Sequence, residues 1–269
     1  MIFTSNNGVA KIAVIFFLLF TSNAKSLQLL MGVDPVNDPN VMAKEVAPLL
    51  EAMNHKYGLE YIPSSSTQEL IQQVKGGNIN CAYVSLGYAY LLQKMGFVLL
   101  LESDEKVKFD LIGKAGLDFD KGENYKSEKV YYVKNDLFMK YMIHEANEKY
   151  SWVANPIPAM TSENIMMKIL KEESSLGYII GDGLQLLHRS LRDNLKVYQS
   201  EEIGSVYFLV NKDFLSISND IRKDFLSFHE GFKDPDERYN YLRVYHFKKV
   251  KNDKLHVNEN YAHYLENYL

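Results

Sequence analysis

Apolar and polar positions alternate along this chain in short blocks that predict strands and helices in turn. Apolar runs bounded by turn residues predict strands at 27–33, 59–62, 79–84, 129–133 and 176–180. Helical spacing of apolar residues predicts helices at 39–57, 68–75, 136–150, 162–171, 217–232 and 236–245. This order favours an α/β fold in which helices flank mostly parallel sheets.

One pattern occurs twice, in residues 67–92 and again in 162–187, at a constant offset of about 95 residues. The aligned positions are Leu70 with Ile165, Ile71 with Met166, Val74 with Ile169, and 82–84 with 177–179. Each copy predicts a helix, a buried strand, a polar turn and a helix, which is half of an α/β lobe. Two such lobes indicate a hinged protein with a cleft; a chance similarity is the alternative.

Residues outside the repeat are assigned to the two expected lobes as well. Residues 25–105 and 199–245 are expected to form lobe I, and residues 106–198 to form lobe II, with crossings near 109–113 and 195–198. Residues 246–269 are expected to be a polar C-terminal tail.

The first 24 residues have the pattern of a secretory signal peptide. A short polar segment with one charge, Lys11, precedes the uncharged run 12–20, and Ser22-Asn23-Ala24 offers small residues for cleavage. The run is short for a membrane span. We therefore expect cleavage and a periplasmic location, with an uncleaved anchor as the alternative.

Composition narrows the classes of function. The chain has a net charge of −4 and no basic block, which argues against nucleic acid as a partner. Cys81 is the single cysteine and alternates with apolar strand residues, so a buried, inert thiol is expected. The seven histidines show no metal-binding spacing, and no catalytic motif is present. No cofactor, no metal and no enzymatic activity are predicted.

Several short motifs in the first third share an order with a known family. They are Met31-Gly32-Val33-Asp34-Pro35, Pro48-Leu49-Leu50 through Gly58, 70–74, Gly76-Gly77, and 79–88, which runs INCAYVSLGY. In this order they resemble the phosphate, phosphite and phosphonate-binding proteins of ABC transporters, a type II Venus-flytrap fold. Asn80 stands where that family usually has Asp. The turn 133–138 lacks the hydroxyls that the family uses to hold its anion, and carries Asp136 instead.

The resemblance implies a periplasmic solute-binding protein. It would capture a small anionic ligand, a phosphonate-like or phosphate-like oxyanion, between its lobes and deliver it to an inner-membrane ABC permease as a monomer. A sensor or adaptor with the same fold, which signals to a membrane partner, is the first alternative. An enzyme on this fold is the second.

Candidate ligand contacts follow from the rule that ligands bind beyond the carboxyl ends of parallel strands, where helix N-termini favour anions. The predicted residues are Asp34, Val36, Asn37, Ser64, Ser65, Ser66, Thr67, Ser85, Leu86 and Tyr88 from lobe I, and Lys134, Asn135, Thr161, Ser162 and Asp182 from lobe II. Simple helix capping is the alternative for Ser66 and Thr67. Ordinary turn positions are the alternative for Ser85, Tyr88 and Asp182.

Overall fold

The computed structural model describes most of the chain after the N-terminal segment. The described residues are 28–36, 38–104, 106–117, 129–150, 156–171, 175–180, 183–230, 247–250 and 254–269. The predicted signal peptide, the predicted helix over 236–245, Asn37 and Asp182 lie outside them.

The first sheet has six strands in the order β11-β4-β10-β3-β1-β2. Its strands are β1 (Leu30–Val33), β2 (Glu60–Tyr61), β3 (Cys81–Ser85), β4 (Phe97–Ser103), β10 (Val206–Asn211) and β11 (Phe247–Lys249). The helices joined to it are α2 (Pro39–Tyr57), α3 (Thr67–Lys75), α4 (Leu86–Lys94), the 3-10 helix η2 (Lys212–Ile217) and α8 (Ser218–Glu230). We call this sheet and its helices lobe I.

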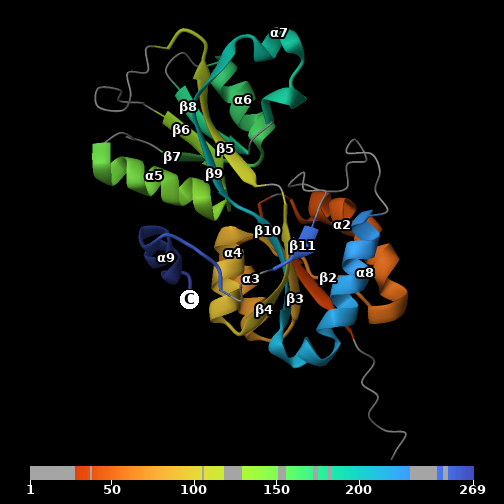
Figure 1. Cartoon of the computed structure of the whole chain (residues 1–269). Helices are drawn as coiled ribbons and strands as arrows, with labels where there is room; N and C mark the ends of the chain where they lie inside the picture. Colours follow the sequence, from red (N-terminus) through yellow and green to blue (C-terminus); the bar gives the residue numbers. More distant parts are fainter. Residues whose placement is uncertain are drawn as a thin grey trace, which may run out of the picture.

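The second sheet has five strands in the order β7-β6-β8-β5-β9. Its strands are β5 (Val107–Lys114), β6 (Lys129–Val133), β7 (Pro156–Ala159), β8 (Ser175–Ile180) and β9 (Leu195–Gly204). The helices joined to it are α5 (Leu137–Tyr150), α6 (Ser162–Lys171), the 3-10 helix η1 (Gly183–Leu186) and α7 (Arg189–Arg192). We call this sheet and its helices lobe II, which lies above lobe I in Figure 1.

The sequence repeat corresponds to equivalent elements in the two lobes. Helix α3 precedes β3 as α6 precedes β8, and the parallel strand orders β2-β1-β3 and β7-β6-β8 match. The two copies differ at one packed position, where Ala82 of the first copy is aligned with Gly177 of the second. A Cβ at Gly177 would overlap the side chain of Ile165 in α6. The second copy also ends in the short η1, where a longer helix was expected.

The α/β class is confirmed, but each sheet is mixed and not mostly parallel. In lobe I, β10 runs antiparallel to both β3 and β4. In lobe II, β5 runs antiparallel to both β8 and β9. The reason is that β5 and β10 each enter their sheet from the other lobe, against the direction of the parallel strands.

Two chain crossings join the lobes. The first runs from β4 to β5, and the second runs from β9 to β10 through Gly204 and Ser205 (Figure 1). The predicted return to lobe I at residue 199 falls inside β9, which pairs with β5 as far as Gly204. Gly204 has φ 137°, a backbone conformation that residues with a side chain rarely adopt.

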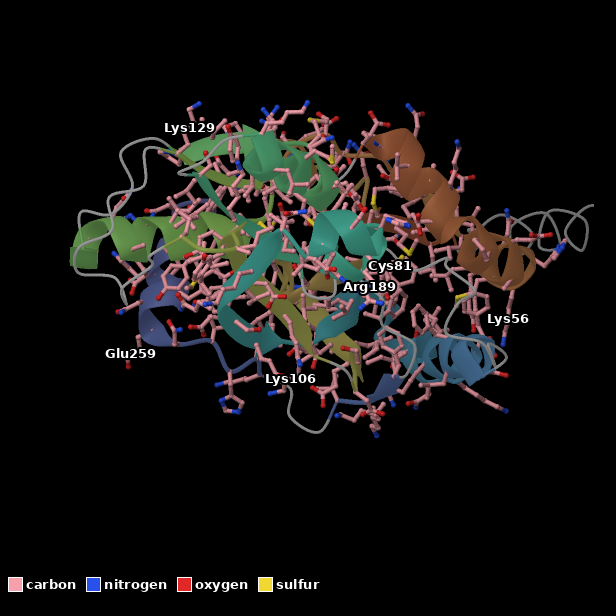
Figure 2. All side chains as sticks on the ribbon, turned by 90° about the horizontal axis from the view of Figure 1, so that it is seen from above. Lys56, Cys81, Lys106, Lys129, Arg189 and Glu259 are labelled. Carbon is pink, nitrogen blue, oxygen red and sulfur yellow. The ribbon has the colours of Figure 1, made fainter. Side chains whose placement is uncertain are left out.

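The expected polar tail instead contains packed secondary structure. Strand β11 pairs with β4, and helix α9 (Glu259–Glu266) buries Tyr261 and Leu265 at a helical i, i+4 spacing. Helix α9 contacts α4 of lobe I and α5 of lobe II. Figure 2 shows α9, with Glu259 at its start, beside the green helix α5.

The interior agrees with the apolar pattern of the sequence. Cys81 is fully buried within β3, which confirms the predicted buried thiol, and burial raises the pKa of this thiol. In the described part of the chain, no helix has both the length and the apolar character needed to cross a bilayer.

Candidate functional site

The strand ends of the two lobes meet at a seam, which we define as Asp34, Ser64–Thr67 and Ser85–Tyr88 of lobe I with Asn135 of lobe II. Asn135 joins the two sides directly. Its Nδ2 donates hydrogen bonds to the backbone oxygens of Pro35 at 2.7 Å and of Ser65 at 2.9 Å. Asn135 is 9% exposed, so these bonds are shielded from water.

Tyr88 forms a second bond across the seam. Its hydroxyl donates to the backbone oxygen of Asn135 at 2.7 Å and lies 2.9 Å from Oγ1 of Thr67. Both Tyr88 and Thr67 are fully or almost fully buried. Burial is the main cause that raises the pKa of Tyr88, and the nearby Asp34 carboxylate adds to the shift. The seam is therefore closed by direct contacts between the lobes.

Carboxylates of the chain itself occupy the helix starts at the seam. Both carboxylate oxygens of Asp34 accept from the backbone N–H of Ser85, the N-cap residue of α4, at 3.2 and 3.0 Å. At the start of α5, Asp136 accepts from the N–H of Met139 at 2.8 Å. Burial raises the pKa of Asp136 to about 6. The backbone donors that would attract an anion already face internal carboxylates at these two starts.

The start of α3 is capped in the way that the alternative interpretation described. Oγ of Ser66 accepts from the N–H of Glu69 at 3.2 Å. The carboxylate of Glu69 in turn accepts from N–H and Oγ of Ser65, at 2.7 and 2.6 Å. These bonds lower the pKa of Glu69. Ser64 donates to Gln73, so the three serines have partners within lobe I.

The other predicted residues lie apart from these contacts. Val36 is buried, and Lys134 is exposed. Oγ1 of Thr161 accepts from the N–H of Asn164, and Oγ of Ser162 accepts from the N–H of Ile180, both within lobe II. Their role in ligand binding, like that of Asn37 and Asp182, stays a prediction.

A cavity of about 440 Å3, which we call the inter-lobe cavity, lies beside the seam. Its walls come from Leu86 of lobe I, from α5, β8 and β9 of lobe II, and from residues 256–258 and Tyr261 near the C-terminus. Of the predicted site residues, it includes Leu86 alone. Sequence patterns indicated Tyr178 only as a core residue, and gave no signal for Glu145 or Glu201.

A second cavity of about 460 Å3 lies near the crossings and shares Leu86, Glu202 and His256 with the first. Its lining mixes both charges, with Lys106, Lys248 and Lys254 beside Glu102, Asp104 and Glu202. Lys248 forms an ion pair with Asp104 at 2.8 Å. Across the described residues, no group of three His, Cys, Asp or Glu side chains is placed to hold a metal ion.

Comparisons with solved structures find the same architecture in proteins of very different sequence. XAC2383 from Xanthomonas citri, bound to chloride ion, has a TM-score of 0.65 at 11% identity, over 90% of this chain and 96% of its own. PhnD1 from Prochlorococcus marinus, in complex with methylphosphonate, has a TM-score of 0.63 at 10% identity, over 91% and 97%. An ancestral arginine-binding protein, bound to arginine, has a TM-score of 0.54 at 12% identity, over 76% and 93%.

These similarities show that the chain has the fold of periplasmic binding proteins. No protein-family model matches the chain. No curated protein is significantly similar to it in sequence.

Proposed function

We propose that this chain is a periplasmic solute-binding protein that captures a small molecule between lobe I and lobe II. The observation that carries the proposal is the inter-lobe cavity, whose walls come from both lobes and whose volume of about 440 Å3 lies in the range of small-molecule sites. A molecule held there contacts both lobes only while they are closed, so binding favours closure.

The two crossings supply the hinge in this proposal. They are a few residues long, and Gly204 gives the second one a conformation that most residues cannot adopt. Hinge bending of this kind absorbs backbone rotation at a small number of positions. The hydrogen bonds of Asn135 and Tyr88 across the seam then hold the closed form.

We propose that the protein serves in uptake of the captured molecule. The protein would be secreted by the predicted signal peptide, remain a monomer, and deliver its ligand to an inner-membrane ABC permease without enzymatic turnover. The fold similarity to PhnD1 in complex with methylphosphonate and to an ancestral arginine-binding protein bound to arginine supports small-molecule capture.

A ligand-responsive adaptor is the second candidate. Helix α9 contacts α4 and α5, so a segment of the chain itself bridges the lobes in the closed form. A surface formed by both lobes and α9 would change when the lobes part, so a membrane signalling partner would read the state of the cavity from it.

The oxyanion predicted from the resemblance competes with the carboxylates that are already in place. Asp34 and Asp136 occupy the helix starts at the seam, and an incoming dianion would be repelled by both. An oxyanion at the seam would require these contacts to rearrange.

Small-angle scattering of the purified protein, combined with thermal unfolding, tests capture between the lobes. Saturating ligand should raise the melting temperature by mass action and remove any open population from the scattering profile. Asn135→Ala should weaken this closure, whereas Asn78→Ala, at an exposed position of lobe I, should not. Scattering profiles and melting temperatures that do not change with any cationic, neutral or anionic compound would contradict the proposal.

A further inference from the structure

The charged residues that line the inter-lobe cavity are mostly acidic. Its lining contains the carboxylates of Glu145, Glu201 and Glu202, and among the described lining residues the one basic side chain is His256. Glu202 also faces Lys108 at 3.4 Å, but both side chains are about half exposed, which makes that pair weak. The second cavity differs because three lysines offset its three carboxylates.

Aromatic rings form a further part of the lining. Phe138, Tyr141, Tyr178 and Tyr261 come from α5, β8 and α9. Tyr141 and Tyr261 lie with their ring centroids 4.8 Å apart, and Phe138 meets Tyr261 edge-on at 5.6 Å. The faces of such rings attract ammonium and guanidinium groups.

One hydroxyl of these aromatic residues is buried. The hydroxyl of Tyr261 is buried and makes no hydrogen bond to any described residue, and Tyr261 is 2% exposed. This hydroxyl lies against Gly87 of α4, and the cost of leaving it unpaired is borne by the folded chain.

The phenols around the cavity lie in a negative environment. After burial, the largest causes that raise the pKa of Tyr261 are the carboxylates of Asp136 and Asp34. The carboxylate of Glu201 likewise adds to the raised pKa of Tyr178. Five carboxylates therefore surround or line this part of the molecule, with Lys140 on α5 partly balancing Asp136.

We propose that the inter-lobe cavity binds an organic cation, an alkylammonium or guanidinium compound. Its charged group lies against Glu201 and Glu145, and its carbon body packs against Tyr178 and Tyr261. This inference rests on the proposed capture between the lobes and names the class of ligand.

Isothermal titration calorimetry with matched probes tests this assignment. The cationic probes are choline and agmatine, the neutral probe is 3,3-dimethylbutan-1-ol, which has the shape of choline, and the anionic probe is methylphosphonate. At least one cationic probe should bind, and choline should bind at least tenfold more tightly than its neutral counterpart.

Glu201→Gln is the informative variant, because glutamine keeps an oxygen that can accept the 2.8 Å hydrogen bond from Gln199. It should weaken cation binding at least tenfold, and Glu145→Gln should act in the same direction. Glu60→Gln, at an exposed position in β2, is the matched control and should bind as the wild type does. Unliganded melting temperatures establish that each variant is folded.

The outcomes separate the two proposals. Binding of methylphosphonate alone would overturn the cation assignment and leave capture between the lobes standing. Cation binding that is equal in wild type, Glu201→Gln and Glu145→Gln would place the ligand elsewhere and overturn the assignment. Failure of every probe to bind, with unchanged scattering, would overturn both.

Discussion

Replacing Asn135 with alanine is expected to shift the molecule from its closed form toward an open one. The substitution removes the two hydrogen bonds that Nδ2 donates to Pro35 and Ser65 across the seam, at 2.7 and 2.9 Å. Each neutral hydrogen bond contributes about 1 kcal/mol net, so the closed form loses about 2 kcal/mol. That free energy corresponds to a shift of about 30-fold in the ratio of closed to open molecules.

Single-molecule energy transfer between the lobes measures this ratio. Dyes placed on Glu51→Cys in α2 and Lys171→Cys in α6 report the separation, because both positions are exposed and lie in different lobes. The native Cys81 thiol is fully buried and should remain unlabelled. The hydrogen bond from Tyr88 to the backbone oxygen of residue 135 is kept in the variant. Any change in the ratio of closed to open molecules therefore reports the loss of the Asn135 side chain alone.

The result that would refute the reasoning is specific. If Asn135→Ala and the control Asn78→Ala give the same transfer distribution and the same free energy of unfolding as the wild type, the seam bonds do not hold the lobes together. A loss of unfolding free energy without any opening would mean that the bonds stabilise a rigid body.

Three further predictions concern other parts of the molecule. The pKa of Asp136 is about 6 in the folded chain, above its ordinary value, so the folded chain binds this proton more tightly than the unfolded chain does. The free energy of unfolding should therefore fall by about 3 kcal/mol as pH rises from about 4 to about 6. Urea unfolding of Asp136→Asn should lack this dependence on pH. Gly87→Ala would overlap the Tyr261 hydroxyl and lower the melting temperature, and Tyr261→Phe should restore part of it; additive melting shifts would contradict this contact. Gly204→Ala should cost about 1–3 kcal/mol in urea unfolding because of its φ of 137°, and unchanged stability would show that the crossing relaxes.

The elements with the clearest patterns were predictable from the sequence. The predicted strand 129–133 and helix 162–171 have the bounds of β6 and α6, and α3 begins one position from its expected start. Periodicity fixes such elements because one face of each is buried.

The location of the seam was also predictable, but its bonding was not. The strand-end rule brought Asp34, Thr67, Ser85, Tyr88 and Asn135 to one place. There Asp34 bonds to Ser85, and Tyr88 bonds to Thr67 and Asn135. The rule specifies a position and says nothing about partners, so it did not reveal that these groups bond to one another. Whether they also contact a ligand remains a prediction.

The residues that line the inter-lobe cavity were not predictable from the sequence, for a different reason. Glu145, Glu201 and Tyr261 come from α5, β9 and α9. Helix α5 and strand β9 meet only in the folded lobe II, and α9 reaches them only after the C-terminal segment has folded back from lobe I. No local spacing connects them. The polar composition of residues 246–269 concealed the two apolar positions, Tyr261 and Leu265, that anchor α9.

The position of α9 has a kinetic consequence for any exchange of solute. The helix holds lobe I through Glu266, which accepts from Tyr90 and Lys94, and it holds lobe II through the rings of Tyr141 and His144 against Tyr264. For the lobes to part, the helix must detach from one of these anchors before a guest can pass. Association should then show a slow phase whose rate does not depend on guest concentration, and cutting the chain before residue 254 should abolish that phase.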